Sequence, residues 1–288
     1  MNPLLSLNRF PPPLLEHILS EWLPLQAAIT LDTAVSSHTH RPSFLAMLQT
    51  CPPWPELAVP GRCVSMRELT WLVARQCSVR SVTLPPKVPS ALFQSFIRSS
   101  SSSLQSLTLD DGRFIGDEEV ELIGSLCREL EYLWLWGCRH MTTAPFPAVL
   151  RHNPKLYQVA VKTQDCAPPS LIACLADSCP LLKEATLGCE TEEVGNAIST
   201  LATRCPLLRT LTLLVEGEID WDMVSTHSAP HKDLVVNAFN LFCEEYNGDD
   251  DDGGDDDGDD LYHQYRDDAQ YDELDEDEEE DEEEEEEQ

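Results

Sequence analysis

The hydrophobic positions of this chain recur at a nearly constant spacing. The pattern Leu-x-x-Leu-x-Leu is present as LQSLTL, LEYLWL and LRTLTL, and weaker copies lie before and between these three. The copies begin at Trp54, Val79, Leu104, Leu130, Leu156, Leu182 and Leu208. The last five starts are 26 residues apart, and the two earlier steps are 25 residues each. Apolar and polar residues alternate within each copy, and this period predicts short β-strands in one repeating register.

Two further apolar columns precede each predicted strand. Seven residues before the starts lie Met47, Leu72, Ile97, Ile123, Val149, Leu175 and Leu201. Ten residues before them lie Phe44, Leu69, Gln94, Val120, Phe146, Ile172 and Ile198, so only Gln94 is polar. Apolar residues three apart are typical of the inner face of a short helix. Each unit is therefore a strand, a loop and a helix. Because one unit cannot bury its apolar face alone, neighbouring units must stack into a solenoid.

Cysteine forms a third column, three residues before each start. This column contains Cys51, Cys127, Cys179 and Cys205, together with Gln76, Ser101 and Asn153, and Cys77 lies one place off. Residues 114–138, FIGDEEVELIGSLCRELEYLWLWGC, resemble the cysteine-containing class of leucine-rich repeat, whose unit also has 26 residues and a cysteine at this place. The resemblance covers about residues 44–215. It implies an α/β solenoid, a leucine-rich-repeat horseshoe with a parallel β-sheet on its concave side and helices outside.

The eleven cysteines are odd in number, dispersed along the chain and free of any CxxC pair. This usage predicts reduced, buried thiols rather than a disulfide framework. A metal site from Cys51, Cys63, His38 and His40 is the alternative, but eleven residues separate the two thiols, whereas structural zinc uses closely spaced ligand pairs. We expect no metal and no cofactor. A GxSxG elbow, a Gly-rich phosphate loop and a recognisable catalytic triad are absent from the sequence, so we expect no enzyme.

Residues 10–50 precede the repeats and predict three short helices. The first helix has an apolar stripe, the second follows Pro24, and the third begins near Pro42. The stripes contain Leu14, Leu15, Ile18, Leu19 and Trp22 in the first helix and Ala28, Ile29, Leu31 and Val35 in the second. Three such helices before repeats of this class resemble an F-box, although Pro13 stands where that family often has glutamate. The alternative is a helical cap that shields the first repeat.

The F-box resemblance implies binding to the small linker subunit, and through it the cullin, of SCF-type cullin–RING ubiquitin ligases. The positions that the resemblance assigns to the linker contact are Phe10, Pro11, Leu14, Leu15 and Ile18. The same side chains could instead form the internal core of the three-helix unit. We therefore divide the chain into an F-box-like unit (1–50), a repeat array with a C-terminal cap (51–247) and an acidic tail (248–288).

The C-terminal part changes character twice. The repeat register fades after Leu213, and residues 231–246 place Leu234, Ala238, Leu241 and Phe242 at helical spacing, which predicts a capping helix. Residues 249–288 then contain 26 acidic residues against Arg266 alone, and contribute −25 of the net charge of −33. A segment of this composition cannot bury enough apolar surface to fold, so we expect disorder.

The charge and hydropathy of the whole chain limit which partners and which location it can have. A net charge of −33 excludes a nucleic-acid-binding surface, which needs clustered lysine and arginine. The N-terminal residues do not resemble a secretory signal, and no run of eighteen apolar residues predicts a membrane span, so we expect an intracellular protein, cytoplasmic or nuclear. The acidic tail also resembles that of the acidic leucine-rich nuclear phosphoproteins. This resemblance implies binding to basic proteins such as histones, and the alternative is a role in solubility.

The strand LEYLWLWGC carries the strongest binding signal. Side chains alternate across a strand, so Tyr132, Trp134 and Trp136 must point to the concave face, with Asp110 and Lys162 at the flanking positions. Exposed tryptophan and tyrosine side chains are enriched among binding hot spots. We therefore predict a non-catalytic adaptor that binds a protein partner through these five residues. Alternatively, the rings pack across strands and stiffen the sheet.

Overall fold

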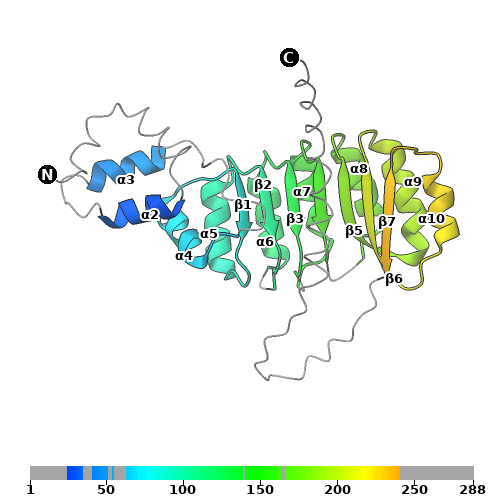
Figure 1. Cartoon of the computed structure of the whole chain (residues 1–288), viewed down its shortest axis with the longest axis horizontal. Helices are drawn as coiled ribbons and strands as arrows, with labels where there is room; N and C mark the ends of the chain where they lie inside the picture. Colours follow the sequence, from blue (N-terminus) through cyan, green and yellow to red (C-terminus); the bar gives the residue numbers. More distant parts are fainter. Residues whose placement is uncertain are drawn as a thin grey trace, which may run out of the picture. The chain divides into compact units, whose positions relative to one another are not determined.

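The structure is a computed structural model that describes residues 25–34, 41–50, 54, 63–113, 115–138, 140–163 and 166–240 (Figure 1). Parallel strands form one sheet with the strand order β1-β2-β3-β4-β5-β6-β7. They are β1 (Ser81–Leu84), β2 (Ser106–Leu109), β3 (Tyr132–Leu135), β4 (Gln158–Val161), β5 (Glu184–Glu190), β6 (Thr210–Glu216) and β7 (Val235–Asn240). Because strands that follow each other in the sequence pair in parallel, each connection between them is a crossover, and the arrangement is consistent with a solenoid.

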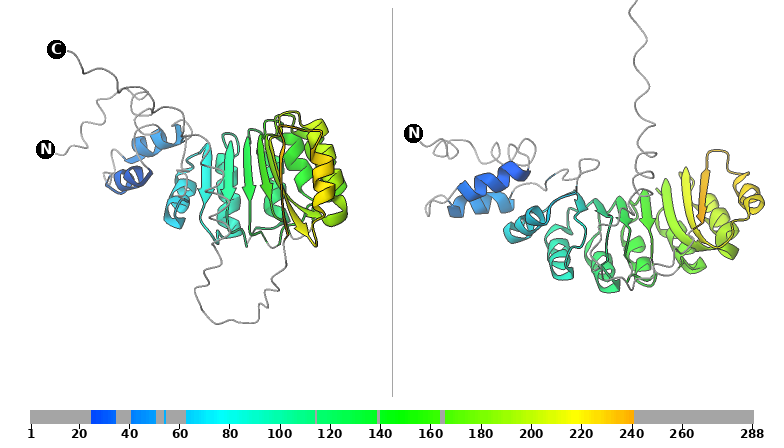
Figure 2. Two further views of the ribbon diagram at one scale, coloured as in Figure 1. Left: turned by 45° about the vertical axis from the view of Figure 1, so that its right-hand side comes forward. Right: turned by 60° about the horizontal axis from the view of Figure 1, so that its bottom comes forward.

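Helices connect the strands and precede the sheet. They are α2 (Leu25–Ala34), α3 (Arg41–Thr50), α4 (Met66–Arg75), α5 (Ser90–Ser100), α6 (Asp117–Leu126), α7 (Phe146–His152), α8 (Pro169–Ser178), the 3-10 helix η3 (Thr191–Glu193), α9 (Val194–Arg204) and α10 (Trp221–Ser228). The helices between the strands lie against one face of the sheet (Figure 2). The chain divides into two units, Met1–Cys243 and Glu244–Gln288, and the second lies outside the described residues.

The strand register confirms the period read from the sequence. Ser81 pairs with Ser106, which pairs with Tyr132, so the steps are 25 and 26 residues. The 26-residue step continues through β4, β5 and β6. A parallel bridge between Trp54 and Val79 joins the starts of the first two predicted copies.

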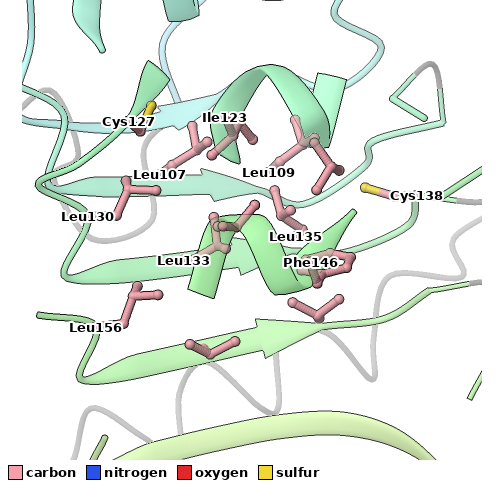
Figure 3. Packing of buried hydrophobic residues seen from close by; sticks show 14 of the residues in the cluster. Leu107, Leu109, Ile123, Cys127, Leu130, Leu133, Leu135, Cys138, Phe146 and Leu156 are labelled. Carbon is pink, nitrogen blue, oxygen red and sulfur yellow. The ribbon is translucent and has the colours of Figure 1, made fainter. Parts of the chain in front are cut away.

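The core lies between the sheet and its helices (Figure 3). Leu133 and Leu135 of β3 point toward the helices, and both are fully buried. Ile123 of α6 is fully buried and Phe146 of α7 is 2% exposed, as the two helix columns predict. Close packing of repeated columns explains why one register is kept along the array, because a slip by one residue would turn the leucines to the other face.

The predicted C-terminal capping helix over 231–246 is wrong. Val235–Asn240 is strand β7, which pairs in parallel with β6 at a 25-residue step, Thr210 to Val235. The apolar spacing of this short segment fits a helix and a strand equally well, and pairing with β6 makes it a strand. Without β7, the backbone groups along this edge of β6 would lack hydrogen-bond partners. At the start of β7, Val235 N donates to Arg209 O at 2.7 Å. Leu241 and Phe242 lie outside the described residues.

The N-terminal helices α2 and α3 match the second and third helices expected from the sequence, and the first lies outside the described residues. Three hydrogen bonds from two side chains of α2 join it to α4. Gln26 Nε2 donates to Glu68 Oε1 at 2.7 Å. Buried Asp32 accepts hydrogen bonds from Trp71 Nε1 and Arg75 Nε, both at 2.9 Å. The contacts connect the N-terminal helices directly to the first helix of the repeats.

Glu119 of α6 explains why Gln94 is polar in an apolar column. Gln94 Nε2 donates to Glu119 Oε1 at 2.9 Å, and Ser90 Oγ donates to the same atom at 2.5 Å. Gly116 N donates to Glu119 Oε2 at 3.0 Å, which completes the helix cap. Burial alone would raise the pKa of Glu119, but these hydrogen bonds outweigh it, and the pKa lies below the ordinary value.

We predict that Glu119→Gln lowers the free energy of unfolding by about 1–3 kcal/mol at neutral pH, because an ionised acceptor of three hydrogen bonds is lost. Since the folded-state pKa is lowered, the stabilisation is present above the unfolded-state pKa and disappears as the pH falls through the folded-state value. Urea unfolding at pH 7 and pH 3 measures both effects. An equal difference between the two proteins at both pH values would contradict the assignment.

The cysteines of the repeat column are buried thiols. None of the described cysteines forms a disulfide bond. Burial raises the pKa of Cys127 and Cys179 to about 12 and that of Cys205 to about 11. They are therefore protonated at neutral pH and pack as small apolar groups. In the same column, Asn153 is fully buried, and its Oδ1 accepts a hydrogen bond from Leu130 N at 3.0 Å, so its polar side chain is satisfied.

Candidate protein-binding face

The sheet face opposite the helices is the candidate site, and we call it the open face (Figure 2). No described helix lies over it. Its side chains come from alternate strand positions, because residues such as Leu133 and Leu135 point into the core. The open face therefore displays the other half of each repeat, which is outside the hydrophobic core.

The rings of β3 gather on this face as the sequence predicts. Tyr132 and Trp134 are partly exposed strand residues between buried leucines, and Trp136 follows the strand. The rings of Trp134 and Trp136 stack, with centroids 5.6 Å apart and an interplanar angle of 23°. The two indoles form one apolar surface that is not part of the core.

The structure brings the predicted charged neighbours to the same place. Trp136 N donates to Leu109 O at 2.8 Å, and Lys162 N donates to Leu135 O at 3.1 Å, so the register continues beyond the strand ends. Asp110 and Lys162 thus flank Trp136 on either side. Lys162 Nζ lies 5.6 Å from the centroid of the Trp136 ring, which is a cation–π contact.

Small residues lie beside the rings toward the C-terminal strands. Ala160 is the neighbour of Trp134 on β4, and Thr186 follows it on β5. Gly188 lies two residues beyond Thr186, and a Cβ there would lie in ordinary van der Waals contact with Cys166 Cα, at 3.9 Å. Ala160, Thr186 and Gly188 form a row of small residues next to the β3 rings, and Ala160 is only 1% exposed.

Sequence reasoning missed two large apolar side chains on this face, which come from β7. Val235 and Phe239 of β7 lie on the open face and are 58% and 41% exposed. Because the segment was expected to be helical, these side chains had no predicted face. Extending the repeat by one more 25-residue step would have placed them. Leu214 of β6, which is 2% exposed, lies between Gly188 and Phe239. Large apolar side chains therefore lie on both sides of the small residues, on β3 and on β6 and β7.

Glu184 begins β5 on the open face and is partly buried. Burial raises the pKa of its carboxyl group, and the nearby charge of Lys183 offsets only part of this. A desolvated carboxylate is stabilised by a nearby cation. Lys183 itself lies over the Tyr157 ring, with Nζ 5.7 Å from the centroid.

The other predicted site residues are not placed by the structure. The positions assigned to linker binding, Phe10, Pro11, Leu14, Leu15 and Ile18, lie outside the described residues, as do three of the four residues of the rejected metal site. Cys63, the fourth, is exposed. Within the described ranges, no group of three or more possible ligands is arranged to hold a metal ion.

A helix long and apolar enough to cross a bilayer is likewise absent from the described part of the chain.

Comparison with protein-family models found no match, and comparison with curated proteins found no similar sequence.

Proposed function

We propose that this protein is a non-catalytic interaction adaptor of the leucine-rich-repeat horseshoe type, which binds a protein partner on the open face. The 25- and 26-residue strand register and the buried cysteine column support the repeat class. A repeat solenoid offers a broad, rigid surface, and rigid surfaces lose little entropy when they bind.

The stacked Trp134–Trp136 pair is the observation that carries the proposal. Rings that only stiffen a sheet would pack against large neighbours on adjacent strands. Here the strand neighbours of Trp134 are Thr108 and Ala160, which are small. Two partly exposed indoles beside small residues resemble the aromatic anchors of binding hot spots.

The F-box reading is part of the same proposal. It would make the protein a substrate-recognition subunit of an SCF-type ubiquitin ligase, with Phe10, Pro11, Leu14, Leu15 and Ile18 contacting the linker. The described helices α2 and α3 and the hydrogen bonds from α2 to α4 are compatible with this role. They would hold a ligase-binding unit in a defined place relative to the repeats.

A second candidate rests on the tail. Its charge of −25 over residues 249–288 would attract basic proteins such as histones, more strongly at low salt. In that case, deletion of residues 249–288 would abolish binding, whereas changes on the open face would not.

We expect the Trp134→Ala/Trp136→Ala double variant to capture its cellular partners at least tenfold less well than the unchanged chain, because each buried indole is worth about 2 kcal/mol or more. Capture of the purified ligase linker should be unaffected. Quantitative co-purification of the full chain from cells, followed by linker binding in vitro, measures both.

The matched control is Trp221→Ala, which removes an indole that is 55% exposed on α10, outside the open face. It should leave both interactions unchanged. Normal partner capture by a correctly folded double variant would refute binding at the open face. Failure of the unchanged chain to bind the linker at micromolar concentration would refute the ligase role alone.

A further inference from the structure

We propose that the edge of the sheet where the chain enters β5 and β6 binds a protein segment that carries both apolar and acidic side chains. We call this surface the leucine rim, and it consists of Tyr157, Leu181, Lys183, Leu207 and Arg209. No tryptophan of the open face belongs to it, so it does not depend on the proposed function. Three observations support the binding: the turns that expose the leucines, the alignment of these turns, and the positive charges beside them.

The same turn exposes a leucine in two successive repeats. Residues 179–183 read Cys-Pro-Leu-Leu-Lys, and residues 205–209 read Cys-Pro-Leu-Leu-Arg. In both, the amide of the second leucine donates to the carbonyl oxygen of the cysteine, at 3.2 and 3.1 Å, so Pro-Leu occupies the middle of a β-turn. The second leucine of each turn is buried in the core, whereas the first, Leu181 or Leu207, is 46% exposed. The turn therefore holds an apolar side chain outside the core.

The two turns lie next to each other, because β5 and β6 pair in parallel (Figure 1). Arg209 N donates to Lys183 O at 2.8 Å, and the same bond joins Lys183 N to Tyr157 O at 2.7 Å. Neighbouring strands are about 5 Å apart, so Leu181 and Leu207, each two residues earlier, belong to one apolar surface. Tyr157 is 36% exposed and extends this surface toward β4. Clustered apolar side chains of this kind mark contact sites, whereas single ones are common on any protein.

Two cations lie directly beside the leucines. Lys183 and Arg209 follow the buried leucines of the two turns and are exposed, so they point away from the core as Leu181 and Leu207 do. Within the described ranges, neither cation forms an ion pair. Lys183 Nζ lies 5.7 Å from the centroid of the Tyr157 ring, and since the ring is neutral, the lysine keeps its charge for a partner.

Some of the carboxylates at this edge of the sheet already have partners. The described ones are Glu129, Glu131, Asp177, Glu184 and Asp233. Glu129 pairs with Lys155, and Asp177 pairs with Arg204. Glu184 is partly buried on the open face, and Glu131 and Asp233 belong to the repeats at the two ends of the rim. An apolar surface with two exposed cations is complementary to a segment in which carboxylates accompany large apolar side chains.

The test selects peptides from a display library of random ten-residue sequences on the full chain. Peptides that also bind the leucine variant, Leu181→Ser/Leu207→Ser, are removed first. Because this variant retains residues 249–288, basic peptides attracted by the acidic tail are removed with them. The remaining peptides should combine leucine, isoleucine or phenylalanine with aspartate or glutamate. Isothermal titration calorimetry then measures their affinity as blocked synthetic peptides.

The variants have distinct expected effects, with folding checked by circular dichroism. The leucine variant should bind these peptides at least tenfold more weakly, because both apolar contacts are lost. The cation variant, Lys183→Gln/Arg209→Gln, should bind them about threefold more weakly, and this loss should shrink at high salt. Leu126→Ser is the matched control, since Leu126 is 37% exposed at the end of α6, outside the rim, and it should change nothing.

The tryptophan variant, Trp134→Ala/Trp136→Ala, separates the two surfaces and should retain full peptide affinity. If it loses the peptides, they bind the open face, and the inference is overturned. The same holds if no peptide distinguishes the full chain from the leucine variant, or if the cation variant keeps full affinity at low salt. Co-sedimentation with phosphatidylserine vesicles, or self-association, that is lost in the leucine variant would assign the rim to a membrane or to a second copy, and either result would also overturn it.

Discussion

Replacement of Leu182 by alanine is expected to lower the free energy of unfolding by about 2–5 kcal/mol, as truncation of a fully buried leucine does. Leu182 starts the repeat unit of β5 and is completely buried within the hydrophobic core. The loss combines the transfer of apolar surface from water with the cavity that remains. Denaturant unfolding followed by circular dichroism measures the change.

The neighbouring residue provides the control. Leu181 undergoes the same chemical change in Leu181→Ala but is 46% exposed, so its truncation should cost less than about 1 kcal/mol. Similar losses for the two variants would contradict the repeat register, because they would mean that Leu181 and Leu182 are buried alike.

Asp32→Ala is expected to lower the free energy of unfolding by about 2–4 kcal/mol. It removes the acceptor of the Trp71 Nε1 and Arg75 Nε hydrogen bonds, each 2.9 Å long, and leaves both donors without that partner. The Asp32 side chain is only 4% exposed and that of Arg75 is 27% exposed, so these bonds are largely shielded from water. Hydrogen exchange should also rise in α2, because the substitution breaks two of its three hydrogen bonds with α4.

An exposed ion pair is the matched control for this variant. Asp177 pairs with Arg204, and their side chains are 56% and 43% exposed. Asp177→Ala should therefore change stability by less than about 1 kcal/mol. If Asp32→Ala were equally mild and exchange in α2 stayed slow, the contact between α2 and α4 would not hold the N-terminal helices in place.

The sequence alone was sufficient for the repeating part of the fold. The 25- and 26-residue steps are the steps of the strand pairing, and the columns that contain Leu133 and Ile123 are buried. Such a prediction is possible in a repeat protein because the same structural position recurs in every copy, so several residues indicate whether that position is buried. Because side chains alternate along a strand, the sequence also assigned Trp134 and Trp136 to the open face.

The tertiary structure alone decided what depends on residues far apart in the chain. Residues 235–240 form a strand because the edge of β6 offers backbone partners, although their own spacing suits a helix equally well. Gln94 is polar because Glu119, 25 residues later, needs a donor. Asp32 is buried because Arg75, 43 residues later, carries the opposite charge. Local spacing encodes which face a side chain takes, whereas these pairings arise only when distant segments pack together.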